Sequence, residues 1–117
     1  MSRFRLSRPA QADLADLLSM SAERWGAKGR RRYAATLATA MCRVAAEPRG
    51  RGTRYRADLL LGIRSFHIRH AARETAEAKV RRPVHILYYR VVQPGLIEIV
   101  RVLHERMEPS RHLSADI

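Results

Sequence analysis

The chain has 117 residues, the size of one domain, and 46% of them are apolar, so we expect a single folded domain over residues 1–117 rather than a disordered chain. It carries 23 basic and 11 acidic residues, a formal net charge of +12. All of the basic residues except Lys28 and Lys79 are arginine. A G+C-rich genome could produce that ratio by codon bias, but the net charge itself implies a polyanionic partner: nucleic acid, an acidic protein, or both.

The cellular compartment can be inferred from features that the sequence lacks. Cys42 is the only cysteine, so no internal disulfide can form, and we expect it to be a small buried side chain. Residues 1–6 lack the apolar core of a signal peptide, and the uncharged stretch 33–42 is about half a membrane span. The sequence therefore predicts a cytoplasmic protein with no membrane association.

The first half of the chain shows a strand pattern followed by helical patterns. Phe4 and Leu6 alternate with polar residues, which indicates a short first strand, and Ser7 with Pro9 suits the start of a helix. Apolar residues then recur at helical spacing over 9–25 and again over 28–47, with Gly26 placed as a C-cap and Pro48 as a stop. The short connection at 26–28 predicts an antiparallel two-helix hairpin. The expected apolar stripes are Leu14, Leu17, Leu18, Ser21 and Trp25, then Tyr33, Leu37, Met41 and Val44.

The second half reads as strands and turns. Residues 48–62 are rich in Gly and Arg, as in a basic surface loop, and 70–82 suit a long hairpin extension. Strands are expected at 63–69, 84–92 and 96–103, the last two joined by a turn at 93–95. The fold class that follows is α+β: an N-terminal strand, an antiparallel two-helix hairpin, then a three-stranded antiparallel sheet (β-α-α-β-β-β).

Six stretches in consistent order carry a resemblance to a known family. They are Leu6–Leu14, Ala22–Gly26, Leu61–Phe66, Leu87–Val91, Ile99–Met107 and Arg111–Leu113. Together they resemble the RelE/ParE toxin superfamily, and its ParE branch most closely. The extension at 70–82 departs from this pattern, because it is longer than in compact members.

The resemblance implies the toxin of a type II toxin–antitoxin system. A cognate acidic, ParD-like antitoxin would wrap and neutralise it in a hetero-oligomer, and the target implied for ParE members is DNA gyrase. No cofactor is implied, and an enzymatic activity is not expected. The alternative, from the RelE branch, is a ribosome-dependent endoribonuclease that cuts mRNA.

The candidate site residues are mostly basic or aromatic. If the protein is a ribonuclease, acid–base and phosphate-binding roles would fall to Arg64, Tyr89, Arg101 and His104. Each has an alternative: Arg64 and Arg101 could lie on solvated strand faces, and His104 could be structural. Tyr88 and Tyr89 should point to opposite sheet faces, one into the core and the other free to stack or donate. The candidates for target or antitoxin binding are Arg64, Arg90, Arg101, His104, Arg106 and Trp25.

Other polar and sulfur-containing residues have simpler interpretations. Glu98 alternates with isoleucines and should face solvent or pair with an arginine, so no carboxylate completes a ribonuclease set. His67 and His70 lack partners at ligand spacing, and no metal site is expected. The arginines of 48–56 and 30–32 are either solvated charge or contacts to phosphate or acidic protein. Met20, Met41 and Met107 are expected in the core.

Overall fold

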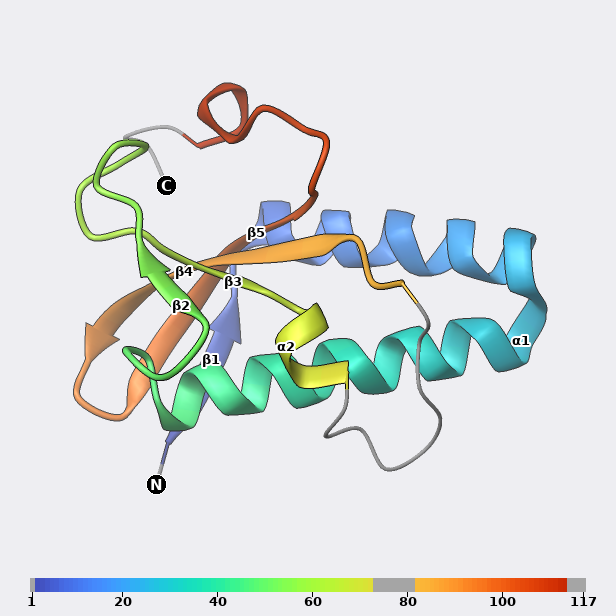
Figure 1. Cartoon of the computed structure of the whole chain (residues 1–117), viewed down its shortest axis with the longest axis horizontal. Helices are drawn as coiled ribbons and strands as arrows, with labels where there is room; N and C mark the ends of the chain where they lie inside the picture. Colours follow the sequence, from blue (N-terminus) through green and yellow to red (C-terminus); the bar gives the residue numbers. More distant parts are fainter. Residues whose placement is uncertain (1, 73–81, 114–117) are drawn as a thin grey trace.

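The computed structural model describes residues 2–72 and 82–113. The chain begins with strand β1 (Arg3–Leu6) and the long helical element α1 (Arg8–Ala46). Strands β2 (Thr53–Tyr55) and β3 (Arg64–His67) follow, then a single turn of helix, α2 (Arg69–Ala72). Strands β4 (His85–Gln93) and β5 (Leu96–His104) form the longest hairpin, and a 3₁₀ turn covers Pro109–Arg111. The α+β class is therefore confirmed (Figure 1).

The sheet is larger and more mixed than the sequence predicted. It has five strands in the order β1-β5-β4-β3-β2, with β1 parallel to β5 and the other neighbours antiparallel. The prediction of a three-stranded sheet is wrong on two counts. The first strand pairs with β5 instead of standing apart, and the Arg-rich loop contains β2, whose three residues show no apolar alternation.

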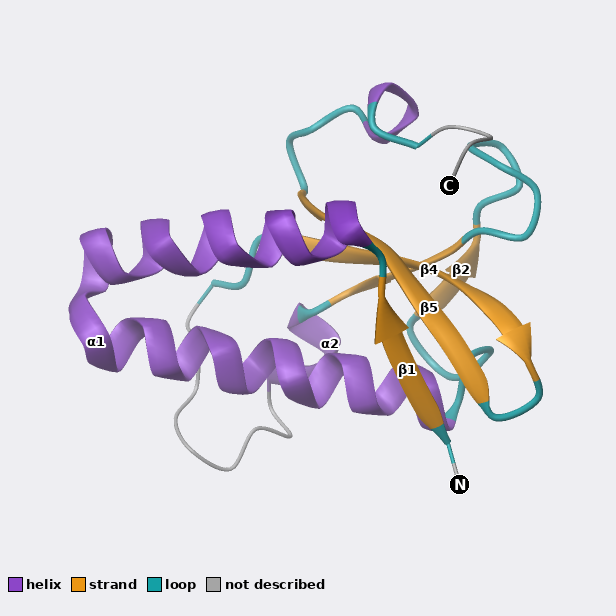
Figure 2. Cartoon of the chain, turned by 180° about the vertical axis from the view of Figure 1, so that it is seen from behind, coloured by secondary structure: helices purple, strands orange, loops and turns teal. Residues whose placement is uncertain are grey.

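The helical part also differs from the predicted pair of separate helices. Helical structure runs from Arg8 to Ala46, and Gly26 alone has non-helical backbone angles, φ 72° and ψ −174°. The ribbon turns back at this residue, so residues 8–25 and 27–46 run antiparallel (Figures 1 and 2). No loop of several residues is present, because a single glycine in a region that L-residues avoid makes the reversal. The prediction of two helices joined by a connection at 26–28 is wrong in this respect.

The start of α1 is fixed against the edge of β5. Ser7 caps the helix, its hydroxyl oxygen accepting from the Ala10 N–H, as predicted, and the same hydroxyl donates to the Val100 carbonyl at 2.8 Å. The Ser7 N–H donates to the Ile99 carbonyl at 3.0 Å. The end of β1 and the beginning of α1 therefore share one strand edge, and α1 leaves the sheet at a defined point.

Apolar side chains pack on both faces of the sheet. The larger cluster joins α1 to one face, and all four residues of the predicted stripe from Tyr33 to Val44 are buried in it. A smaller cluster on the other face contains Ile63, Tyr88, Val100, Leu103 and Leu113. Tyr89 lies in the larger cluster and Tyr88 in the smaller one, so both tyrosines are core. Neither ring is exposed for stacking, because Leu59, Leu60, Ile63 and Leu113 pack on the second face. The other expected possibility, a donated hydrogen bond, is met by the Tyr89 hydroxyl, which donates to the Pro48 carbonyl.

The remaining fold predictions concern the extension at 70–82, the burial of Cys42 and membrane association. The extension predicted at 70–82 begins with α2 rather than with strand, and residues 73–81 lie outside the described part. Cys42 is exposed, which corrects its expected burial. Within the described ranges, no helix is long and apolar enough to cross a membrane.

The reversal at Gly26 can be tested by substitution. A Cβ at this position would meet no atom within 4 Å, so the effect of Gly26→Ala is confined to backbone strain. We expect the free energy of unfolding to fall by about 1–3 kcal/mol, measured by urea denaturation. D-alanine introduced at position 26 by semisynthesis is the control, because the mirror-image backbone angles suit it. Equal loss of stability with both residues would contradict the assignment of strain.

Candidate functional site

A cavity of about 360 Å³ opens between the first arm of α1 and the ends of the two longest strands. The second arm contributes Tyr33, the start of β4 contributes His85, and the end of β5 contributes His104. The full lining is Asp13, Asp16, Leu17, Met20, Ser21, Arg24, Trp25, Tyr33, Val84, His85, Val102, His104, Arg106 and Met107.

The rim of the cavity is unusually apolar for a surface. Met20, Trp25 and Met107 are exposed over 65%, 58% and 47% of their areas. The expectation that the methionines are core residues is confirmed for Met41 and wrong for Met20 and Met107. Met20 lies on the part of α1 that extends past the sheet, and Met107 lies in the segment after β5. Grouped exposed apolar side chains rimmed by polar ones mark interaction sites.

The floor of the cavity is a short row of three rings in contact, Tyr33, His85 and His104. The Tyr33 hydroxyl accepts the Val84 N–H at 3.1 Å and lies 2.6 Å from Nδ1 of His85. The His85 ring meets the His104 ring edge to face, with centroids 5.6 Å apart. Because its oxygen is already an acceptor, the Tyr33 hydroxyl is free to donate to Nδ1, which assigns the ring proton of neutral His85 to Nε2.

Burial sets the charge of this floor. Desolvation, followed by the neighbouring His104, lowers the pKa of His85 to about 4, so the ring is neutral at physiological pH. Desolvation also raises the pKa of Tyr33, which keeps the phenol protonated. The floor therefore carries no charge from these two groups, and it suits apolar or neutral polar side chains.

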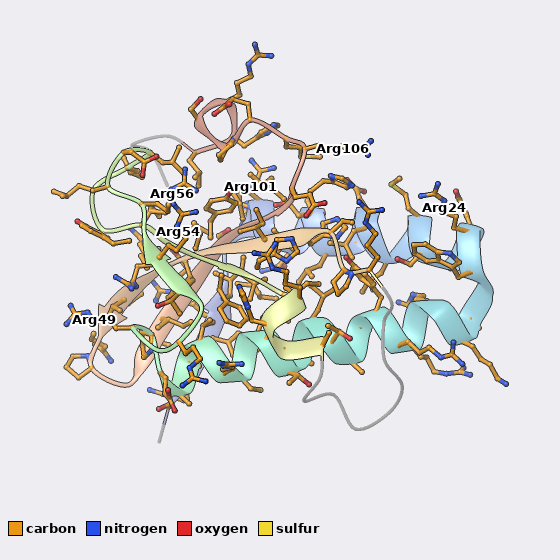
Figure 3. The ribbon with its side chains drawn as sticks, viewed as in Figure 1. Arg24, Arg49, Arg54, Arg56, Arg101 and Arg106 are labelled. Atoms are coloured by element: carbon orange, nitrogen blue, oxygen red, sulfur yellow. The ribbon has the colours of Figure 1, made fainter. Side chains whose placement is uncertain are left out.

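Cations lie at the rim. The Arg24 guanidinium carbon lies 5.7 Å from the Trp25 ring centroid, and Arg106 lines the cavity from the segment after β5. Figure 3 shows both arginines on the same side of the molecule. Exposed apolar side chains next to arginines are typical of a surface that accepts an amphipathic acidic segment.

Arg101, a predicted anion-binding residue, lies in an ion pair within the fold. Its guanidinium makes two hydrogen bonds of 2.8 Å to the Asp13 carboxylate and a third, of 3.1 Å, to the His112 carbonyl. Asp13 also accepts the Val102 N–H at 2.9 Å. The Asp13–Arg101 clamp therefore ties α1, β5 and the C-terminal segment together, and Arg101 contacts protein groups with three of its donors.

Arg64 and Tyr89 are held beneath the loop that follows α1. Both donate to the Pro48 carbonyl, and Arg64 also donates to the Thr53 hydroxyl at 3.0 Å. Burial raises the pKa of Tyr89, whose side chain is fully enclosed. The four ribonuclease candidates thus fall in three places: Arg64 with Tyr89, Arg101 in the clamp, and His104 in the cavity.

The binding candidates divide similarly. His104, Arg106 and Trp25 meet at the cavity, whereas Arg64 and Arg101 do not. Arg90 lies on β4, where Glu98 binds it at 2.9 Å and binds Arg5 at 3.1 Å, which bears out the pairing of Glu98 with arginine.

Sequence reasoning missed several cavity residues, notably His85, Tyr33 as a hydrogen-bonding group, and the exposed methionines. Their signals were ambiguous: Tyr33 belongs to an apolar stripe, and His85 lies in an almost continuous apolar run. Among the residues that the structure describes, no group of three or more His, Cys, Asp or Glu could hold a metal ion.

Comparison with known proteins gives a consistent result. A family model described as the ParE toxin of a type II toxin–antitoxin system, parDE, matches residues 4–109. Toxin ParE1 of Mycobacterium tuberculosis strain H37Rv is 35% identical over 112 residues, covering 96% of this chain and 98% of that protein. Toxin ParE1 of Caulobacter vibrioides is 32% identical over 114 residues, covering 97% and 99%.

The neutral state of His85 predicts a pH dependence of stability. The folded-state pKa of about 4 lies below the ordinary value of 6.5, so the unfolded chain binds the extra proton first as pH falls. We expect stability to decline between about pH 6.5 and 4. His85→Gln should flatten that decline in urea titrations, whereas His112→Gln, outside the cavity, should leave it in place. If stability declined with falling pH equally steeply in the His85 variant and in the parent, the lowered pKa would not belong to His85.

Proposed function

Because this chain belongs to the ParE toxin family of type II toxin–antitoxin systems, we propose that it inhibits growth by poisoning DNA gyrase in the cytoplasm and that a cognate acidic antitoxin neutralises it. The proposed mode of action is non-enzymatic: the toxin would bind the gyrase–DNA complex and prolong its cleaved state. The antitoxin would form a hetero-oligomer with the toxin and so withhold it from gyrase.

The cavity beside α1 is the observation that carries the antitoxin part of the proposal. Three large apolar side chains, Met20, Trp25 and Met107, are exposed around it, and Arg24 and Arg106 flank them. Burying a large apolar side chain is worth about 1.5–3 kcal/mol, and Trp and Arg are the residues most often dominant in interfaces. An antitoxin helix or strand with apolar anchors between acidic residues would match this pattern.

The placement of the ribonuclease candidates favours a binding function over RNA cleavage. Arg101 contacts Asp13 and a backbone carbonyl, while Arg64 and Tyr89 share the Pro48 carbonyl. A nuclease needs an acid, a base and a phosphate-binding group within reach of one reacting phosphate. His104 is the one candidate of the four that lines the cavity.

Gyrase poisoning is tested with purified proteins. Gyrase, ATP and supercoiled plasmid are incubated with the toxin and then treated with detergent and protease. We expect linear plasmid to accumulate with toxin and to disappear when the antitoxin is added first. Unchanged supercoiling and cleavage, together with codon-phased mRNA cuts after induction in cells, would replace the proposal with the ribonuclease alternative.

The role of the cavity is tested through Trp25. We expect Trp25→Ala to weaken antitoxin binding about tenfold or more, because truncation of a central aromatic residue commonly costs over 1.4 kcal/mol. Isothermal titration calorimetry with the purified antitoxin measures the effect. Leu61→Ala is the matched control, since Leu61 is 83% exposed and lies outside the cavity. Equal affinity of the Trp25 variant and the parent would remove the cavity from the interface.

A further inference from the structure

The loop between α1 and β3 presents arginines that the fold does not use. Arg49, Arg51 and Arg54 are exposed, and the ion pairs within the described part of the chain do not include them. Arg54 lies near Asp58, but the hydrogen bonds of that carboxylate go to Arg56, at 3.0 and 3.1 Å. We call residues 49–56 the arginine loop.

The backbone of the arginine loop is held at its start and near its middle by side chains from α1, β3 and β4. The Pro48 carbonyl accepts hydrogen bonds from Arg64 and Tyr89, and the Arg51 carbonyl accepts one from Arg43 at 3.3 Å. The two bonds to Pro48, the residue just before the loop, are partly buried, and the bond from Arg43 to Arg51 lies at the exposed surface. The exposed guanidinium groups therefore extend from an anchored backbone, which lowers the entropy lost when they bind a ligand.

Further contacts tighten the loop locally. The Thr53 hydroxyl donates to the Gly50 carbonyl at 2.7 Å, and Gly52, with φ 86°, lies against Phe66 and His70. At Gly52 a Cβ would come within 3.1 Å of both rings, so the backbone approaches the core closely here. The arginine loop is thus a fixed part of the surface.

The charge around the loop is strongly positive. Residues 43–64 contain six arginines and two acidic residues, Glu47 and Asp58. Tyr55, 52% exposed on the edge strand β2, lies 5.9 Å from the Arg64 guanidinium and adds an accessible ring. In Figure 3, Arg49, Arg54 and Arg56 gather at one end of the molecule, and Arg24 and Arg106 lie towards the other. The loop and the cavity are therefore separate surfaces.

We propose that the arginine loop binds the phosphate backbone of duplex DNA, through Arg49, Arg51 and Arg54. The guanidinium fork suits bidentate contact with phosphate oxygens, and phosphate contacts require cations but no apolar centre. An acidic protein partner would be expected instead where apolar anchors and arginines coincide, which is the cavity. The biological role inferred for this contact, holding the toxin on DNA beside gyrase, rests on the proposed function.

A second arginine cluster offers a contrast and a control. Arg30, Arg31 and Arg32 are also exposed, on the second arm of α1. Successive residues on a helix point about 100° apart, so three in a row cannot face one phosphate strand together. Replacing these three arginines removes the same number of positive charges as the loop variant does, but from another part of the molecule.

The test is direct DNA binding by the full-length toxin. Fluorescence anisotropy of a labelled duplex is measured over roughly 50 to 200 mM salt for the parent, for Arg49→Gln/Arg51→Gln/Arg54→Gln, and for Arg30→Gln/Arg31→Gln/Arg32→Gln. We expect the loop variant to bind about tenfold or more weakly and its log–log salt slope to shrink by about 2.7, at about 0.9 per lost phosphate contact. The helix variant should keep the larger part of both, and thermal denaturation verifies that each variant folds.

Three results would overturn the inference: no DNA binding by the parent, equal losses in the two variants, or lost antitoxin affinity with DNA binding intact. The last result would assign the loop to an acidic protein. The gyrase cleavage assay separates this inference from the proposed function. Loop-dependent DNA binding without gyrase poisoning would refute the proposed function alone, whereas poisoning with loop-independent DNA binding would refute the inference alone.

Discussion

The position of α1 against the sheet depends on the hydrogen bonds of the Asp13 carboxylate. Strand β1 ends at Leu6, and beyond Ile99 the edge of β5 would be left without a neighbouring strand. There Asp13 accepts a hydrogen bond from the Val102 N–H and binds the Arg101 guanidinium with both carboxylate oxygens. A side chain of α1 thus accepts the backbone hydrogen bond that a neighbouring strand would otherwise accept. Moving the helix away would leave the half-buried carboxylate and guanidinium without their hydrogen-bond partners, which costs free energy. The contact therefore fixes the first arm of α1 beside the end of β5. The cavity lies between those two elements, and Asp13 is part of its wall.

Much of the fold follows from local chemistry that the sequence displays. Ser7 with Pro9 indicates the start of α1, the stripe from Tyr33 to Val44 is buried as its spacing requires, and the two long strands lie close to their predicted positions. These signals are periodic and extend over several residues. The same patterns cannot give the partner of a four-residue strand, because pairing depends on where the chain returns. The pairing of β1 with β5 was missed for that reason, whereas β2 was missed because its three residues show no apolar alternation.

The candidate site was less predictable than the fold. Arginine interrupting an apolar strand indicates an anion site and a structural ion pair equally well, and only the position of Asp13, 88 residues away from Arg101, distinguishes them. An irregularity in the pairing of β4 with β5 also makes the direction of side chains on β5 hard to predict. The pairing passes from Tyr88 with Arg101 to Tyr89 with Ile99, so Val100 is an extra residue and the alternation of faces shifts by one. Trp25 shows the same ambiguity: its spacing placed it on the apolar stripe of the first arm, but its side chain is 58% exposed and lines the cavity.

The single-residue reversal in α1 also constrains how the length of this chain can vary. Gly26 joins the two arms without a loop that could absorb an extra residue. One residue inserted between Gly26 and Tyr33 would rotate the rest of the second arm by about 100° and turn its buried stripe away from the sheet. Insertions of three or four residues would nearly restore the orientation, but the reversal at Gly26 could move outward by about one helical turn only if the first arm gained a turn as well. Length changes among relatives should therefore occur here in whole turns and in both arms together, each deepening or shortening the wall of the cavity.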